Sequence, residues 1–232
     1  YTLVRGRTYK MRFDILTANP KIVTSPIENG LIGRATKKGL VEVYVHHLRD
    51  YAEGKYRQID DSPFGGGVGM ILKPEPFFRC AEKLKSEREY DAIINFSPQG
   101  KRLNQKAAND FSLKQNFMLL CGHYKGIDER VIKYLATEEV SIGDFVLSCG
   151  DLAAVIFMDA VARLIPGALG DSESSLTDTF QVDTVFDAPL YTRPEKYGKY
   201  KVPAVLLSGN HAKIKEWREK KAKAKYRKSK KK

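Results

Sequence analysis

The sequence predicts an α/β protein built on a mainly parallel sheet. Four short runs are strand-like: MRFDIL (11–16), VEVYV (41–45), AIINF (92–96) and FMLL (117–120). Helix-like runs follow Pro74, Leu103 and Ile127, namely PEPFFRCAEKLKSE, NQKAANDFS and DERVIKYLA. Strands that alternate with helices favour a parallel sheet with helices on its faces.

The segments that follow the predicted strands indicate a ligand site. They are SPQGKR (97–102), CGHYKGID (121–128) and SIGDFVLSCGD (141–151), all expected to be loops. In parallel sheets a ligand binds beyond the carboxyl ends of the strands. The chain has neither a P-loop nor a G-x-G-x-x-G pattern, which argues against a triphosphate or a nicotinamide dinucleotide. A neutral nucleoside such as adenosine fits better, because Gly122, Ile142, Gly143 and Leu147 can offer backbone groups and apolar contacts.

Another loop is expected at GGGVGM (65–70), because three consecutive glycines destabilise a helix or strand. Such a loop either lets a substrate approach the backbone closely or is simply a flexible turn.

The run LAAVIFMDAVARLIP (152–166) predicts a helix that is apolar nearly all round. A helix of this kind is buried in the core or in an oligomer interface. Pro166 and Gly167 should end it, and Arg163 is its one basic residue. Residues 168–179 are small and polar and predict an interdomain linker. Residues 180–232 are basic and aromatic, and a helix should begin near Ser208.

The charge is concentrated at the end of the chain. The net charge is +12, and residues 213–232 hold twelve Lys or Arg against two Glu, which leaves +2 for the rest. A cationic tail of this kind favours RNA or DNA, although a purely solvated end has the same composition. No apolar run approaches the ~20 residues that span a bilayer, so no membrane association is expected. Three widely spaced cysteines without C-x-x-C predict a reducing cytoplasm rather than a disulfide framework or zinc site.

Several motifs together resemble one family. SPQG, LCGHYKGIDERV, SIGDFVLSCGDLAA, DAVARLIPGALG and YTRPE occur in the order and at about the spacing of the bacterial tRNA (guanine-37-N1)-methyltransferases. RDYAEGKYRQIDDSPFGGGVGM and VLLSGNHAKIKEWR also resemble that family, so the match runs from about Met11 to Arg218. The resemblance implies a SPOUT-type parallel sheet with a deep C-terminal trefoil knot, followed by a small, mainly helical C-terminal domain. It also implies a homodimer whose active sites lie at the interface.

The resemblance divides the chain into three parts. Residues 11–167 would form the methyltransferase domain that binds S-adenosylmethionine, 168–179 the linker, and 180–232 a tRNA-binding domain with a Lys-rich tail. The cofactor contacts that it implies are Pro98, Gly122, Tyr124, Ile142, Gly143, Asp144, Phe145, Val146, Leu147 and Gly150.

The resemblance also implies the catalytic residues. N1 of guanine carries a proton, so methylation needs a general base and a group that stabilises the charge growing on O6. By motif the base is Asp178, in TDTF, and the cationic helper is Arg163. From residue type alone, a solvated linker acid is the more common interpretation of Asp178, and Arg163 could be a helix-terminal salt-bridge partner. The implied substrate contacts are Gly66, Gly67, Arg49, Asp50 and His211.

The chain departs from the family pattern at three positions. Lys125 replaces a common Glu that the resemblance places near the methionine part of the cofactor, which puts an acid-dependent role or a role for Mg²⁺ there in doubt. Cys149-Gly150 stands where paired glycines are usual, and Asp151 replaces Glu. Two alternative functions remain: a ribose 2′-O-methyltransferase of the same knotted class, or a non-catalytic RNA-binding protein.

Overall fold

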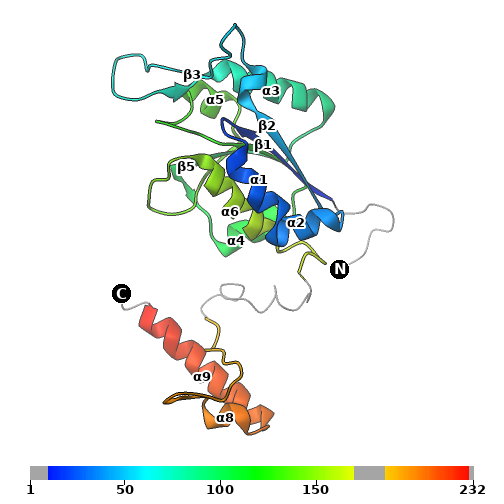
Figure 1. Ribbon diagram of the computed structural model, residues 1–232, viewed down its shortest axis with the longest axis vertical. Helices are drawn as coiled ribbons and strands as arrows, with labels where there is room; N and C mark the ends of the chain where they lie inside the picture. The colour runs from blue at the N-terminus through cyan, green and yellow to red at the C-terminus, as the bar shows by residue number, and fades with distance from the viewer. Residues whose placement is uncertain (1–9, 170–185, 230–232) are drawn as a thin grey trace. The chain divides into compact units, whose positions relative to one another are not determined.

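The computed structural model describes residues 10–169 and 186–229 (Figure 1). The chain divides into two compact units, Tyr1–Ser172 and Glu173–Lys232, so the boundary falls within the segment 168–179. None of the helices within the described ranges is long and apolar enough to cross a membrane.

The first unit is built on a five-stranded sheet whose paired strands are all parallel. Its strand order is β2 (Val41–His47), β1 (Met11–Thr17), β6 (Asn116–Leu120), β5 (Ala92–Arg102) and β7 (Glu138–Ser141). The four predicted strands are therefore confirmed. Strand β7 was not predicted, because two of its four residues are glutamates and the segment is not apolar.

Strand β5 is longer than predicted. The segment 97–102 was expected to be a loop, but it belongs to β5. Phe96 and Lys101 both pair with Val140 of β7, so the residues between them form an irregularity in the ladder. Pro98 lies within this irregularity, where it cannot donate a ladder hydrogen bond.

Helices cover both faces of the sheet (Figure 1). One face packs against α1 (Lys21–Glu28), α2 (Gly30–Lys37), α4 (Gln105–Ser112) and α6 (Gly150–Ala162). The other face packs against the 3₁₀ helix η1 (Leu48–Tyr51), α3 (Pro74–Glu87) and α5 (Glu129–Tyr134). Helices α1 and α2 were not predicted, because Pro26, Gly30 and Gly33 lower the helix propensity of their sequence. A short antiparallel pair, β3 (Asp60–Asp61) and β4 (Ile71–Leu72), flanks the glycine-rich loop.

Helix α6 is central to the core. Its Phe157 is fully buried, and its ring lies 5.0 Å from that of Phe111, 5.7 Å from that of Phe117 and 5.8 Å from that of Phe96, centroid to centroid. The helix spans 150–162 rather than the predicted 152–166, and Arg163 is its C-terminal cap residue. The following residues make tighter i→i−3 hydrogen bonds before Pro166 ends the run.

A buried ionic cluster lies on β1 and β2. Asp14 is completely buried and accepts two hydrogen bonds from Arg12, at 2.7 and 2.8 Å, and one from the Tyr90 hydroxyl at 2.9 Å. His46 Nε2 lies 2.8 Å from Asp14 Oδ1. Burial raises the pKa of Asp14, but the hydrogen bonds from His46, Arg12 and Tyr90 outweigh it and lower the pKa from 3.8 to about 2.

Acid should therefore destabilise the first unit through Asp14. A carboxyl whose pKa is lower in the folded state stabilises the protein above its unfolded pKa, and that contribution of about 2 kcal/mol is lost as the pH falls from about 4 towards 2. Urea unfolding at several pH values should show this loss in the wild type and not in Asp14→Asn. The exposed acid substitution Glu82→Gln is the control, and its pH dependence should match the wild type. Parallel curves for Asp14→Asn and the wild type would contradict the assignment.

The second unit is small and mainly helical within its described part. It contains the hairpin of β8 (Lys196–Tyr197) and β9 (Tyr200–Lys201), then α8 (Ala204–Leu207) and α9 (His211–Ser229). The helix predicted near Ser208 begins at His211, after Asn210, whose side chain accepts a hydrogen bond from the Lys213 amide at 3.1 Å. The rings of Tyr191 and Trp217 lie 6.3 Å apart.

Candidate functional site

A cavity of about 230 Å³ lies at the carboxyl ends of β5, β6 and β7. Three chain segments line it: the irregular part of β5, the loop that follows β6, and the loop between β7 and α6. Nine of the ten predicted cofactor contacts line this cavity: Pro98, Gly122, Tyr124, Ile142, Gly143, Phe145, Val146, Leu147 and Gly150. The structure thus brings together residues from three separate motifs.

Asp144 is the predicted contact that does not line the cavity. Its carboxylate pairs with the Arg102 guanidinium of β5, and its side chain is largely exposed. Its neighbours Gly143 and Phe145 do line the cavity. Position within the motif alone does not tell which of these adjacent residues line the cavity.

The start of α6 presses against the loop that follows β6. The Gly150 amide donates a hydrogen bond to the Gly122 carbonyl at 2.8 Å. A Cβ atom at Gly150 would lie 2.9 Å from the Gly122 nitrogen and 3.2 Å from the Cys121 Cα, so a side chain there would push these two segments apart. Glycine at position 150 is therefore required by the close contact of the two backbones.

Cys149 fits where the family pattern has glycine. Its backbone is extended, with φ −157° and ψ 158°, a conformation open to any residue. Its thiol is buried, and burial raises its pKa. The neighbouring Asp151 is buried as well and accepts a 2.5 Å hydrogen bond from the Thr17 hydroxyl, while burial raises the pKa of Asp151.

The loop after β7 is held by its own hydrogen bonds. Ser141 is buried, and its hydroxyl donates to the Gly143 carbonyl at 3.0 Å and accepts from the Gly143 amide at 3.2 Å. This arrangement orients the backbone at the base of the cavity, beside Ile142. Fixed backbone groups of this kind can recognise the polar edge of a flat ligand.

The cavity lining is mostly apolar or glycine and contains no Asp or Glu. Lys125 is the one lining residue with a permanent charge. Within residues 10–169 and 186–229, no group of three His, Cys, Asp or Glu is placed to hold a metal ion. The site is suited to a largely neutral ring system rather than to a polyphosphate.

Sequence reasoning missed several lining residues. They are Phe96, Ser97, His123, Gly126, Val140, Ser141, Ser148 and Ala153; Lys125 and Cys149, already noted as departures from the family pattern, also line the cavity. Most of them are neighbours of predicted contacts within the same motifs, which is the signal that could have identified them.

Arg163, one of the two predicted catalytic residues, does not line this cavity within one chain. Arg163 is half-buried at the end of α6 opposite Gly150. The 13 residues of α6 span about 20 Å at ~1.5 Å per residue. That distance exceeds the reach of an arginine side chain. Asp178 lies outside the described residues.

The predicted substrate contacts lie in three places. Gly66 and Gly67 have positive φ in the loop between β3 and β4, and Arg49 and Asp50 are on η1. Arg57 contacts both of these η1 residues. Its carbonyl accepts a 3.3 Å hydrogen bond from the Arg49 guanidinium, and its own guanidinium lies 3.6 Å from the Asp50 carboxylate. His211 begins α9 in the second unit.

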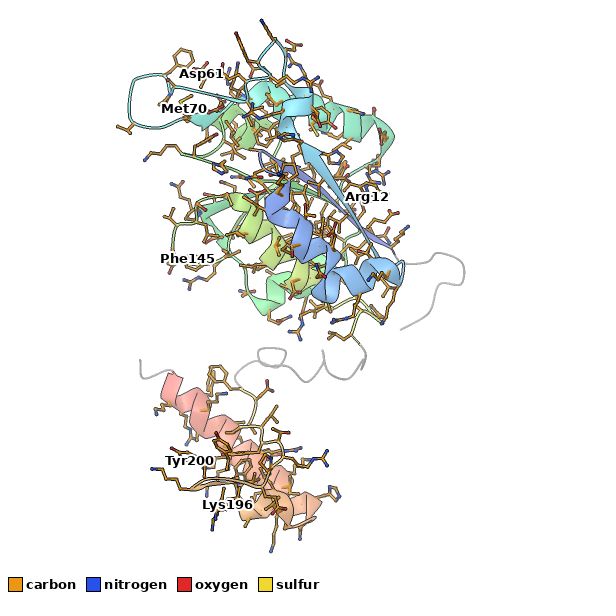
Figure 2. The ribbon with its side chains drawn as sticks, in the orientation of Figure 1. Arg12, Asp61, Met70, Phe145, Lys196 and Tyr200 are labelled. Atoms are coloured by element: carbon orange, nitrogen blue, oxygen red, sulfur yellow. The ribbon has the colours of Figure 1, made fainter. Side chains whose placement is uncertain are left out.

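The glycine-rich loop is joined to the cavity loop. The Lys125 amide donates to the Met70 carbonyl at 3.1 Å, and the Leu72 amide donates to the Gly126 carbonyl at 3.0 Å. Figure 2 labels Met70 and Asp61 at the ends of the glycine-rich loop and Phe145 on the loop before α6.

Comparison with known proteins places the chain in a family. The sequence profile described as tRNA (Guanine-1)-methyltransferase TrmD matches residues 11–232. The chain belongs to this family. Among the relatives of this TrmD-family chain, a tRNA (guanine-N(1)-)-methyltransferase of Chlorobaculum tepidum is 54% identical over 212 residues, which is 91% of this chain and 92% of the relative. A protein of the same name from Bacteroides thetaiotaomicron is 51% identical over 207 residues, or 89% of this chain and 92% of the relative.

A solved structure of another family member has the same fold. The crystal structure of tRNA (m1G37) methyltransferase from Aquifex aeolicus superimposes with a TM-score of 0.76 at 39% identity, covering 90% of this chain and 87% of that one. The predicted family and the α/β fold are thus confirmed.

Proposed function

We propose that this TrmD-family chain transfers a methyl group from S-adenosylmethionine to N1 of guanine 37 of tRNA, next to the anticodon. The observation that supports this most directly is the convergence of three family motifs on one cavity, whose lining is mostly apolar or glycine. The cytoplasm, where tRNA is modified, is the expected location, and the three cysteines are free and buried, as suits a reducing compartment.

The cavity fits the proposed cofactor. Ile142, Gly143 and Leu147 offer backbone groups and apolar contacts suited to adenosine, and the lining glycines leave room for a ligand. S-adenosylmethionine supplies a methyl group that its sulfonium already activates, so the protein has mainly to align donor and acceptor. Magnesium is a poorer fit, because no carboxylate lines the cavity, and we assign it no step.

Asp178 and Arg163 are the proposed catalytic residues. Asp178 accepts the proton from N1 of guanine, which turns N1 into a nucleophile. Arg163 stabilises the negative charge that this leaves on O6. The guanine must leave its stack to meet these groups, as other base-modifying enzymes require.

A homodimer would assemble these parts. Arg163 is about 20 Å along α6 from Gly150, so the arginine that acts at one cavity would come from a partner subunit. Leu152 and Ile156 lie on the same side of α6 as Arg163, by helical spacing, and are 41% and 49% exposed. An exposed apolar stripe of this kind is suited to a subunit interface.

We further infer a trefoil knot in the part of the chain that forms the cavity. Two close contacts support this inference. The first residue of α6, Gly150, touches Cys121 and Gly122, and a Cβ atom at Gly100 of β5 would lie 2.6 Å from the Val140 nitrogen of β7. These contacts bring β5, β7, the loop after β6 and the start of α6 together, as a knot formed from these segments would require.

The tRNA is proposed to contact both units. Helix α9 presents nine Lys or Arg against two Glu, a charge that suits phosphate groups. Gly66, Gly67, Arg49, Asp50 and His211 remain proposed substrate contacts.

Incubation with tRNA and a labelled methyl donor tests the proposal. Unmodified tRNA with guanine at position 37 should yield 1-methylguanosine on nucleoside analysis, and the same tRNA with adenine 37 should yield none. A product methylated only on ribose would instead support the alternative of a 2′-O-methyltransferase. Absence of both methylation and S-adenosylmethionine binding would favour a non-catalytic RNA-binding protein.

A further inference from the structure

Lys125 occupies a distinctive place at the edge of the cavity. It follows Tyr124, whose φ of 58° lies in the left-handed region. Its backbone amide donates a hydrogen bond to the Met70 carbonyl. The side chain lines the cavity from the loop after β6. In the described residues, its ammonium has no acid within salt-bridge distance.

Gly69 supports the stem of this side chain. A Cβ atom at Gly69 would lie 2.9 Å from Lys125 Cγ and 3.3 Å from Lys125 Cε, and the φ of Gly69 is +101°. Any residue other than glycine would therefore strain the backbone and displace the Lys125 stem. The glycine-rich loop thus contributes to the shape of the cavity through this contact, although Gly69 does not line the cavity.

The charges of the proposed cofactor and of the cavity can be compared group by group. S-adenosylmethionine has a sulfonium, an ammonium and one carboxylate. The cavity lining offers one permanent charge, the Lys125 ammonium, and no acid. The carboxylate is thus the one group of the donor that this cation attracts, and a charge-assisted hydrogen bond between the two is the favourable arrangement.

We propose that the Lys125 ammonium binds the carboxylate of the methionine part of the donor, and that the backbone of Gly69 holds the lysine stem in position. This assignment rests on the proposed function, since it requires S-adenosylmethionine in the cavity. Lys125 is then a donor-binding residue and Gly69 a positioning residue.

Two ligands that differ in the amino acid part test the assignment. Calorimetry on the full chain would measure the affinity for S-adenosylhomocysteine, which has the carboxylate, and for 5′-methylthioadenosine, which lacks it. Lys125→Met should lower the affinity for S-adenosylhomocysteine about tenfold, as expected for the loss of one charge-assisted hydrogen bond. It should leave the affinity for 5′-methylthioadenosine unchanged. Lys125→Arg should retain most of the affinity, and Gly69→Ala should show the same selective loss to a smaller degree. Lys133→Met, at an exposed lysine of α5 outside the cavity, is the matched control and should change neither affinity.

Each other outcome contradicts this assignment in a different way. Equal affinity of Lys125→Met and the wild type for S-adenosylhomocysteine would refute the carboxylate contact. An equal loss of affinity for both ligands would indicate a structural role for Lys125. A loss confined to tRNA affinity would show that Lys125 contacts RNA phosphate instead. If the wild type bound neither ligand, the proposed function itself would fail.

Discussion

Replacing Asp178 with alanine should slow methyl transfer to guanine by about 10²–10⁴-fold, the usual contribution of a positioned general base. The affinity for S-adenosylhomocysteine should not change, because none of the residues that line the cavity is altered. Single-turnover rates with saturating tRNA and donor would measure the chemical step. Calorimetry on the same preparation would measure binding.

The pH dependence separates a base from a structural role. Without Asp178 the N1 proton must leave to solvent, so the residual rate of Asp178→Ala should rise steadily with pH. The wild-type rate should level off once the carboxylate is ionised. Asp171→Ala removes another acid of the same segment and is the matched control, with an expected rate close to that of the wild type. An equal loss in both variants would show that the segment needs negative charge in general rather than one base.

The sheet was predictable because its strands are buried on both faces. Parallel strands of this kind are often continuous apolar runs, as Phe117–Leu120 of β6 is, whereas β1 also holds the buried Arg12–Asp14 pair. Strand β7 lacks this signal, since it begins with Glu138 and Glu139. Its second glutamate accepts a 2.9 Å hydrogen bond from the Asn95 amide of β5, a contact that depends on the fold and not on the local sequence.

The cavity was predictable for a different reason. Its lining comes from three contiguous motifs, each placed directly after or within a strand, and the topology of a parallel sheet brings such segments to one edge. The contact between Gly69 and Lys125 was not predictable, because it joins residues far apart in the sequence whose approach is fixed by the pairing of 70–72 with 125–128. The exclusion of Asp144 from the lining likewise depends on its pairing with Arg102.

Two inactive variants should restore activity when they are combined in one dimer. Gly150→Val should abolish donor binding, because even a Cβ atom at this position meets the backbone of Gly122. In a heterodimer with Asp178→Ala, one cavity is intact and the partner supplies an intact Asp178. In a random mixture half of the dimers are heterodimers with one working site of two, so activity should return to about a quarter of the wild-type value.

The result depends on which subunit supplies the base. Arg163 is fixed on α6 about 20 Å from Gly150, which favours catalytic groups from the partner. Asp178 is nine residues beyond Leu169, a length that can span up to ~30 Å, so chain length alone allows either origin. Only a base that acts across the interface permits rescue, because a base that acts within its own chain leaves both sites of the heterodimer inactive.

The control is the combination of Asp178→Ala with the double variant Gly150→Val/Asp178→Ala. These dimers contain an intact cavity but no Asp178, so they should remain inactive. If Gly150→Val fails to fold, Gly143→Val can replace it, since a Cβ atom there would lie 2.3 Å from the Phe145 ring, in the same cavity. Mixed dimers, verified by two different affinity tags, that stay inactive in both pairings would show that Asp178 acts at the cavity of its own chain. Arg163 is intact in all of these variants, so the experiment reports on the origin of Asp178 alone.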